Sequence, residues 1–219
     1  LYTMPLSKPD SLIFDMDGTL WDATDTYVEA WNRGFKKYGI EKVMERKVLD
    51  AMMGWEQKKV FTAVFPDMRE EEWMKMAEII HETQDEILPV IGGTLYDYVL
   101  EGIKKLSEDY KLFIVSNCPK NAIKQMISFS KIENYITDEF AHGVNNMPKA
   151  HNIKLLMEKH ALKNPYYVGD TESDRIQSEN AGIPFVFVDY GFGTTDNYDL
   201  KFSSFEALTL FFSDLGNFK

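Results

Sequence analysis

Short apolar runs and longer amphipathic segments alternate along much of the chain. Runs of this length, rich in β-branched and aromatic residues, are typical of strands buried on both faces of a parallel sheet. The segments between them repeat apolar residues at helical spacing, and one of them ends in Gly182, a usual helix stop. The alternation predicts a doubly wound α/β fold with a mainly parallel sheet. The expected strands are 11–14, 111–116, 165–169 and 184–188, with a weaker one at 138–143, and the expected helices are 96–110, 119–130, 149–162 and 173–182.

The segment 23–88 breaks this alternation, because it contains no strand-like run. Its pattern predicts a small bundle of helices inserted after the first strand. The returning segment 88–94, LPVIGGT, contains one proline and two glycines, a composition typical of a bend or hinge. We therefore expect a core domain of residues 1–22 and 89–219 and an inserted helical domain of residues 23–88. The helices expected within the insertion are 26–39, 44–54, 56–65 and 69–88.

Composition narrows the possible partners. The chain has 219 residues and a formal net charge of -11, so we expect binding neither to nucleic acid nor to an anionic membrane. No apolar run reaches the roughly 18 residues that span a bilayer, and the opening LYTMPLSKPD lacks the apolar core of a secretory signal. Cys118 is the one cysteine, so no internal disulfide can form. These features predict a cytoplasmic protein, and we expect a monomer or weak dimer.

Polar residues follow three of the expected strands, at the point where each strand ends. DMDGT follows the first strand at 15–19, SN closes the second at 116–117, and GDTESD closes the third at 169–174. Each motif alone has an ordinary explanation, such as turn chemistry or helix capping. In open α/β sheets, however, ligands bind beyond the carboxyl ends of the strands. Their convergence on one sheet edge therefore predicts a functional site.

The charge of this predicted site requires cations. Asp15, Asp17, Asp170 and Asp174 would bring four carboxylates into one crevice, which raises carboxylate pKa values unless a cation is present. Oxygen ligands without a nearby histidine or cysteine cluster favour Mg²⁺ over zinc. Lys149 is the candidate second cation, because a lysine at the start of a helix opposes the helix dipole and indicates a functional reason.

In order and spacing, these features resemble the four motifs of the haloacid dehalogenase superfamily. The motifs are DMDGTLWD, SN, a lysine that opens a helix, and GDTESD, and the resemblance covers essentially the whole chain. The inserted helices resemble the mobile cap of that superfamily, and the phosphoglycolate-phosphatase-like branch looks closest. The resemblance implies a Rossmann-like core sheet with a helical cap. One departure is that Lys149 is preceded by Pro148 and followed by Ala150, whereas many relatives have proline after the lysine.

The resemblance implies a Mg²⁺-dependent phosphatase that acts on a small organic phosphomonoester. Asp15 would be the nucleophile that accepts the phosphoryl group, and Asp17 the general acid and then the base. Ser116 and the Asn117 backbone would hold phosphate oxygens, while Lys149 would neutralise charge on the transferring group.

The same resemblance implies the metal ligands. Asp15, the Asp17 carbonyl and Asp170 would hold Mg²⁺, and Asp174 would serve the outer shell of the metal or orient Lys149.

Three other functions remain open at this point. A sugar-phosphate mutase resembling β-phosphoglucomutase uses the same acid as Asp17 and differs only in the phosphoryl acceptor. A phospho-accepting signalling module also gathers acidic residues and a lysine at strand ends, but it is shorter and lacks the helical insertion. A catalytically silent scaffold is the third, and it would not need the full carboxylate set.

The loop MMGWEQKK, residues 52–59, is a candidate for substrate contacts. Gly54 lies between two expected helices of the insertion, and in capped relatives a loop of this kind covers the active site. Trp55, Gln57 and Lys58 are therefore candidate substrate-binding residues. A solvent-facing helix start is an equally good interpretation of the same residues.

Overall fold

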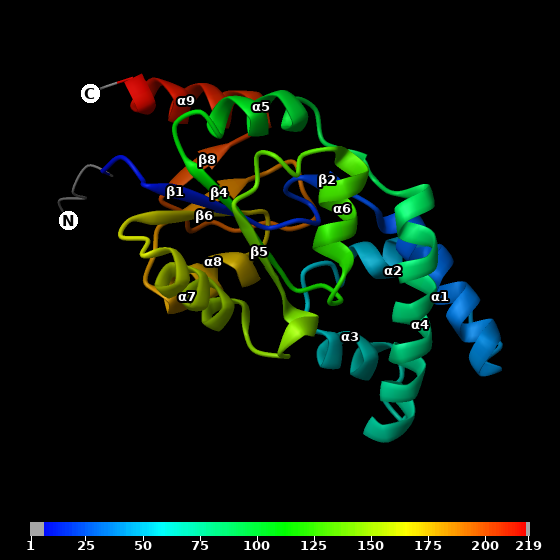
Figure 1. Cartoon of the computed structure of the whole chain (residues 1–219). Helices are drawn as coiled ribbons and strands as arrows, with labels where there is room; N and C mark the ends of the chain where they lie inside the picture. The colour runs from blue at the N-terminus through cyan, green and yellow to red at the C-terminus, as the bar shows by residue number, and fades with distance from the viewer. Residues whose placement is uncertain (1–6, 218–219) are drawn as a thin grey trace.

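A six-stranded parallel sheet forms the centre of the fold (Figure 1). The computed structural model describes residues 7–217, so most of the opening segment considered above lies outside the described part. The strands, in spatial order, are β5 (Asp138–Ala141), β4 (Lys111–Ser116), β1 (Ser11–Phe14), β6 (Pro165–Gly169), β7 (Phe185–Val188) and β8 (Leu200–Phe202). The doubly wound α/β prediction is confirmed, and β1 lies between β4 and β6.

Helices cover both faces of this sheet because successive strand residues point to opposite sides. On β1, Leu12 and Phe14 pack into one apolar cluster with α5 and α9, whereas Ile13 packs into a second cluster with α7 and α8. Figure 1 shows α5 and α9 together on one side of the sheet and α7 and α8 on the other. The helices of this part are α5 (Val99–Leu106), α6 (Ala122–Ser130), α7 (Lys149–His160), α8 (Glu172–Ala181) and α9 (Phe205–Asn217).

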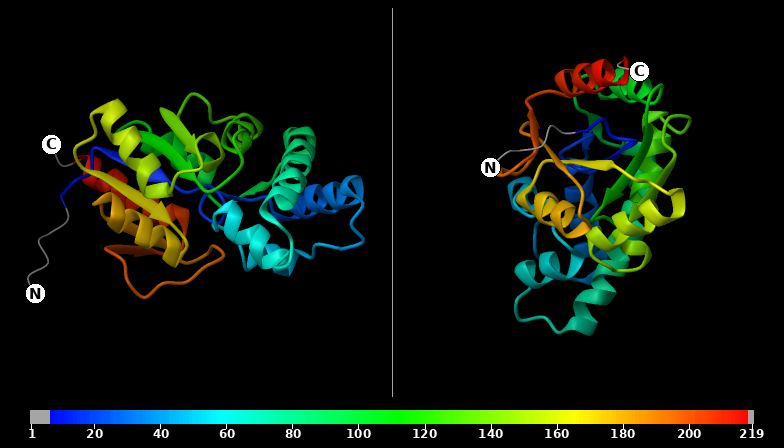
Figure 2. Two further views of the ribbon diagram at one scale, coloured as in Figure 1. Left: turned by 90° about the horizontal axis from the view of Figure 1, so that it is seen from below. Right: turned by 90° about the vertical axis from the view of Figure 1, so that its left-hand side faces the viewer.

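The insertion after β1 consists of helices, as its pattern predicts. They lie beyond one end of the sheet, beside α6 (Figure 2). The long helices α1 and α4 pack against each other. The Phe61 ring stacks on Trp31 of α1 and on Trp73 of α4. The helices are α1 (Thr24–Tyr38), α2 (Arg46–Asp50), α3 (Gln57–Val64) and α4 (Glu70–Ile91).

A short two-stranded ribbon joins the insertion to the sheet. β2 (Trp21–Asp22) pairs antiparallel with β3 (Thr94–Leu95), so the outgoing and returning chains lie side by side. The Thr26 hydroxyl donates to the Gly92 carbonyl at 2.6 Å and adds a second tie. Gly93 allows this approach, because a Cβ there would lie 2.7 Å from the Ala23 Cβ.

Some elements differ from the sequence-based expectation. α4 continues through Pro89 to Ile91, so the bend expected at 88–94 begins only at Gly92. Pro89 has no N–H to donate to the Asp85 carbonyl, and the Gln125 side chain donates to that carbonyl at 3.4 Å. β2, β3, β8 and α9 were not predicted. Within residues 7–217, no helix is long and apolar enough to cross a membrane.

Candidate active site

Three buried carboxylates meet at the carboxyl ends of β1 and β6. One oxygen from each of Asp15, Asp170 and Asp174 lies within 4.8 Å of the others. All three side chains are at most 1% exposed. Asp15 directly follows β1 and Asp170 directly follows β6, and Asp174 lies in the first turn of α8. The parallel pairing of β1 with β6 brings these residues together, although they are far apart in the sequence.

Lys149 lies against two of these carboxylates. Its Nζ is 2.6 Å from Oδ1 of Asp174 and 3.1 Å from Oδ1 of Asp15, and the side chain is 1% exposed. Lys149 is the first residue of α7, which packs on α8 and thereby directs the ammonium group to the end of the sheet. Burial alone would lower the pKa of Lys149, but Asp15 and Asp174 raise it above the ordinary value. The lysine is therefore charged.

The Asp15 carboxylate is fixed in position, but its oxygens still have unused acceptor positions. Its backbone N–H donates to the Val168 carbonyl at 2.8 Å, which fixes the residue at the end of the strand. Among residues 7–217, its oxygens lie close to the Lys149 ammonium, the Ser116 side chain and the Met16 N–H, but neither accepts a hydrogen bond of regular geometry. Burial raises the pKa of Asp15, Lys149 opposes the rise, and Asp174 adds to it. This carboxylate thus has free lone pairs for a metal ion or an electrophile.

The Asp17 side chain points away from that cluster toward α1. Its Oδ1 accepts hydrogen bonds from Tyr27 Oη at 2.8 Å and from Trp21 Nε1 at 3.0 Å. Burial raises the pKa of Asp17 to about 7, although the hydrogen bond from Tyr27 opposes the rise. A carboxyl group with this pKa exists in both protonation states near neutral pH, which suits a general acid and base. Tyr27 and Trp21 were not singled out from the sequence.

Asp170 and Asp174 differ in how their oxygens are used. Oδ1 of Asp170 accepts from the Thr19 hydroxyl at 3.2 Å, and Oδ2 accepts from the Phe192 N–H at 2.7 Å. Oδ2 of Asp174 accepts from the backbone N–H groups of Asp170 and Thr171 and from the Thr171 hydroxyl, while Oδ1 accepts from Lys149. Asp174 therefore orients Lys149 and Thr171. Asp170 accepts fewer hydrogen bonds and so has more free lone pairs for a metal ion.

Gly18 is required by the shape of the site. It adopts φ +84°, which L side chains rarely adopt, and a Cβ there would lie 2.2 Å from Oδ2 of Asp170. Gly191, in the loop after β7, makes a similar approach, because its Cβ would lie 2.3 Å from the same oxygen. The two loops thus close tightly on the Asp170 carboxylate.

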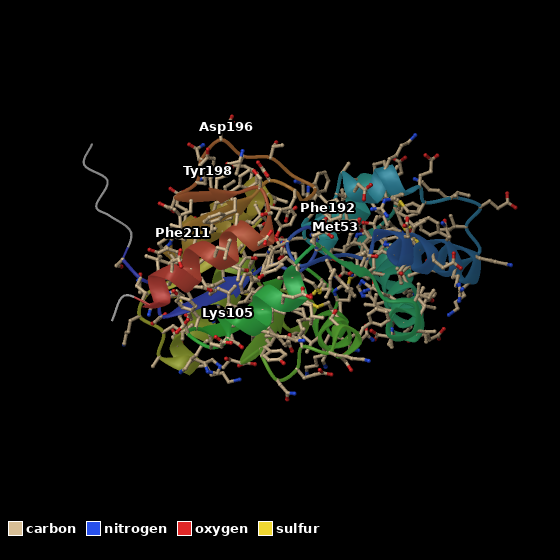
Figure 3. The ribbon with its side chains drawn as sticks, turned by 90° about the horizontal axis from the view of Figure 1, so that it is seen from above. Met53, Lys105, Phe192, Asp196, Tyr198 and Phe211 are labelled. Atoms are coloured by element: carbon tan, nitrogen blue, oxygen red, sulfur yellow. The ribbon has the colours of Figure 1, made fainter. Side chains whose placement is uncertain are left out.

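The inserted helices reach the site through the loop between α2 and α3. Asn117 Nδ2 donates to the Gly54 carbonyl at 2.9 Å, so the residue after β4 holds the loop of the insertion. Met53 of this loop and Phe192 of the loop after β7 both lie where the helical insertion meets the sheet (Figure 3). Ser116, the last residue of β4, is buried, and its side chain lowers the pKa of Asp15.

A cavity of about 110 Å³ lies between the insertion and the sheet. Asp17 and Asn117 contribute to its sheet side, and Trp55 and Gln57 contribute to the side formed by the insertion. Lys58 does not reach it. Its side chain is 69% exposed and pairs with Glu70 at 3.2 Å, so the expected substrate contact is not present in this structure. Gln57, Val60 and Phe61 occupy the inner face of α3 at helical spacing, which places Lys58 outside.

Cys118 lines the same cavity, but its thiol is not activated as a nucleophile. The thiol is buried, and burial raises its pKa well above the ordinary value, with Asp17 and Asp15 adding to the rise. A thiol in this state is a poor nucleophile. Its environment agrees with a packing role.

The residues present fit a hard divalent cation. Asp170 has a pKa raised well above its ordinary value, first by burial and then by the negative Asp174 and Asp15. Lys149 alone does not balance three carboxylates, and Asp15 has oxygens without regular hydrogen bonds in residues 7–217. An oxygen-only donor set of this kind suits Mg²⁺.

The parallel sheet, with three buried carboxylates and a buried lysine at the carboxyl ends of its strands, has the arrangement expected of a haloacid dehalogenase-like hydrolase. Residues 12–188 match the family model described as haloacid dehalogenase-like hydrolase, so the chain belongs to this family. The family model makes the chain a hydrolase, and its similarity to phosphoglycolate phosphatases agrees with the branch expected from the sequence.

Relatives of known sequence and structure agree with this assignment. The chain is 26% identical to the phosphoglycolate phosphatase of Rhodobacter capsulatus, with 90% of this chain and 94% of the relative covered. It is 25% identical to the phosphoglycolate phosphatase of Vibrio vulnificus, with 83% and 84% covered. A haloacid dehalogenase-like hydrolase from Streptococcus pneumoniae has the same fold, with a TM-score of 0.81, 19% identity, and 94% of this chain and 99% of that chain covered.

Proposed function

We propose that the protein is a Mg²⁺-dependent phosphatase that hydrolyses a small phosphomonoester through a phospho-aspartate at Asp15. The single observation that carries this proposal is the Asp15 carboxylate, which is buried beside Lys149 yet has oxygens free of regular hydrogen bonds within residues 7–217. A carboxylate in that position can attack a phosphoryl group while the lysine offsets the negative charge of the reactants.

The other side chains have separate roles in the proposed reaction. The Asp15 carboxylate attacks phosphorus, and Asp17 protonates the oxygen of the departing alcohol. Asp17 then removes a proton from the water that hydrolyses the acyl phosphate. Ser116 and the Asn117 backbone bind phosphate oxygens, and Lys149 balances their charge.

Asp15, the Asp17 carbonyl and Asp170 would hold Mg²⁺, with Asp174 in the outer shell. When bound, the metal would neutralise charge on the transferring phosphoryl group. The four hydrogen bonds to Asp174 support its outer role, because they occupy both of its carboxylate oxygens.

We also propose that residues 23–88 act as a cap that moves as a unit about the two segments that connect it to the sheet. The β2–β3 ribbon and the glycines at 92 and 93 support this proposal, because they confine the connection to one narrow strip. A closing cap would exclude water while the leaving group departs. A single buried cysteine also supports the proposal that the protein acts in a cytoplasm.

The test is phosphate release from small phosphomonoesters with Mg²⁺ and with EDTA, for the wild-type chain and Asp15→Asn. We expect release to need Mg²⁺ and to fall by at least about 10³-fold in the variant, as for loss of a nucleophile. Assaying sugar-phosphate isomers in the same reactions separates hydrolysis from mutase activity. Near-wild-type release by a folded Asp15→Asn variant would overturn the mechanism.

A further inference from the structure

The cavity beside Asp17 has no cationic side chain in its lining. Its wall is formed mainly by apolar and aromatic residues of the insertion, including Trp31, Met52 and Phe61, and no lysine or arginine contributes within the described residues. The two lysines of α3 do not contribute to the lining. Lys58 pairs with Glu70, and the Lys59 ammonium lies 3.7 Å from the centre of the Trp55 ring.

Two histidines line the cavity, and an imidazole is a weaker counter-ion than a lysine or arginine. Burial lowers the pKa of His81, so this imidazole is neutral near pH 7. The His142 Nδ1 lies 3.0 Å from the Met147 carbonyl, which can only accept, so this nitrogen carries a proton and donates to that carbonyl. A carboxylate that entered the cavity would therefore lose its hydration without gaining a lysine or arginine partner.

Two neutral hydrogen-bonding groups are available instead. The Gln84 side chain on α4 lines the cavity, is 4% exposed, and has no hydrogen-bond partner for its amide nitrogen among residues 7–217. A buried amide without a partner is unfavourable, and a ligand that supplies an acceptor removes this penalty. Asn117 Oδ1, at the sheet side of the cavity, likewise lacks a donor within the same residues.

We propose that the alcohol portion of the substrate is uncharged and largely apolar, and that it offers a neutral polar group to Gln84. This inference rests on the proposed phosphatase function and names its substrate class. Phosphoglycolate, the substrate in the names of the relatives, has a carboxylate on its leaving group and is excluded as a good substrate by this cavity.

The test compares three esters with the full chain and Mg²⁺: phosphoglycolate, its uncharged amide phosphoglycolamide, and benzyl phosphate. The first two match in size and differ in charge. We expect kcat/KM for phosphoglycolamide and for benzyl phosphate to exceed that for phosphoglycolate by at least about tenfold. Equal or faster hydrolysis of phosphoglycolate would overturn this inference while leaving the phosphatase function intact. If none of these esters nor p-nitrophenyl phosphate releases phosphate, the proposed function fails as well.

Variants at position 84 test the residue itself. Gln84→Arg should raise the ratio of kcat/KM for phosphoglycolate to that for phosphoglycolamide by about tenfold or more, because it supplies the missing cation. Met74→Arg is the matched control, since it adds the same charge on the exposed side of α4, and it should leave the ratio unchanged.

Circular dichroism verifies that each variant is folded. Gln84→Met preserves the volume of the side chain and removes the amide. It tests the role of this amide even if the Gln84→Arg variant does not fold. It should reduce kcat/KM for phosphoglycolamide more than for benzyl phosphate. Equal reduction for both esters would overturn the role of Gln84.

Discussion

The Tyr27 hydroxyl donates a hydrogen bond of 2.8 Å to Oδ1 of Asp17, and so joins helix α1 directly to the loop that follows strand β1. The two residues belong to different parts of the fold, because Tyr27 lies on the first helix of the insertion and Asp17 follows the central strand. Trp21 donates to the same oxygen and completes a fixed cradle for the carboxyl group. The orientation of the proposed acid therefore depends on where α1 lies.

This relationship predicts that Tyr27 positions the acid without itself reacting. Tyr27→Phe should lower kcat for alkyl phosphates by about tenfold, as expected for loss of one hydrogen bond to a charged group. Steady-state kinetics with an alkyl phosphate and with p-nitrophenyl phosphate give the measurement, and the activated ester should be affected less. Tyr38→Phe is the matched control, because its hydroxyl bonds to the Glu72 carbonyl away from the site. An equal loss in both variants would contradict the positioning role.

Asp17→Asn should show the same dependence on the leaving group more strongly. Loss of a general acid costs about 10²–10⁴-fold when the leaving alcohol needs a proton. p-Nitrophenol leaves without one, so phosphorylation of Asp15 by its ester should persist. A single-turnover experiment measures the burst of p-nitrophenol, which precedes the step that needs a base. Equal losses in the burst rate and in alkyl phosphate turnover would argue against the acid role.

Metal binding should be visible as thermal stabilisation, independently of turnover. A ligand that binds only the folded state at 100 times its Kd stabilises by about 2.7 kcal/mol. We expect Mg²⁺ to raise the Tm of the wild-type chain and to have little effect on Asp170→Asn, measured by differential scanning fluorimetry. Asp196→Asn removes the same charge from an exposed position in the loop after β7 and should retain the Mg²⁺ response. A full response in Asp170→Asn would remove this residue from the ligand set.

β1, β4, β6 and β7 were predictable because each is a short, largely apolar run that is buried on both faces. Ile13 and Phe14, for example, are both fully buried although they point to opposite sides. β2 and β3 have two residues each and exist only because they pair with one another, a contact that no local pattern reveals. α9 had a readable signal, since Phe205, Leu208 and Phe212 recur at helical spacing.

The site likewise contains residues that local motifs predict and residues that only long-range packing brings in. Asp15, Asp170 and Lys149 follow from the ends of strands and the start of a helix, so their convergence could be anticipated. Tyr27 could not be anticipated, because its contact with Asp17 depends on how the insertion docks. Lys58 stays a predicted substrate contact, but in this structure its exposed side chain pairs with Glu70 outside the cavity.

A charge network ties the start of the insertion together. The Arg46 guanidinium pairs with Asp22 on β2, with Asp25 on α1 at 2.8 Å, and with Asp50 on α2 at 3.4 Å. Burial would raise the pKa of Asp22, but the Thr24 N–H and the Arg46 side chain lower it below its ordinary value of 3.8. Because the folded state binds this proton less readily than the unfolded chain, ionised Asp22 stabilises the fold above that value.

Arg46→Met should therefore destabilise the protein in a pH-dependent manner. We expect a loss of about 1 kcal/mol in the free energy of unfolding near neutral pH, a modest value because the guanidinium is partly exposed. The difference between wild type and variant should shrink as the pH falls below the ordinary value of 3.8 and through the lower folded pKa, since Asp22 is then protonated. Urea unfolding in buffers at about pH 7, 5 and 3 measures this difference across the window.

Arg33→Met is the matched control, because the Arg33–Glu29 pair is an exposed pair within one helix, and it should change stability by only about 0.3–0.5 kcal/mol. A destabilisation by Arg46→Met that stays constant down to the lowest pH would show that packing of the arginine stem, and not its pairing with Asp22, stabilises this junction.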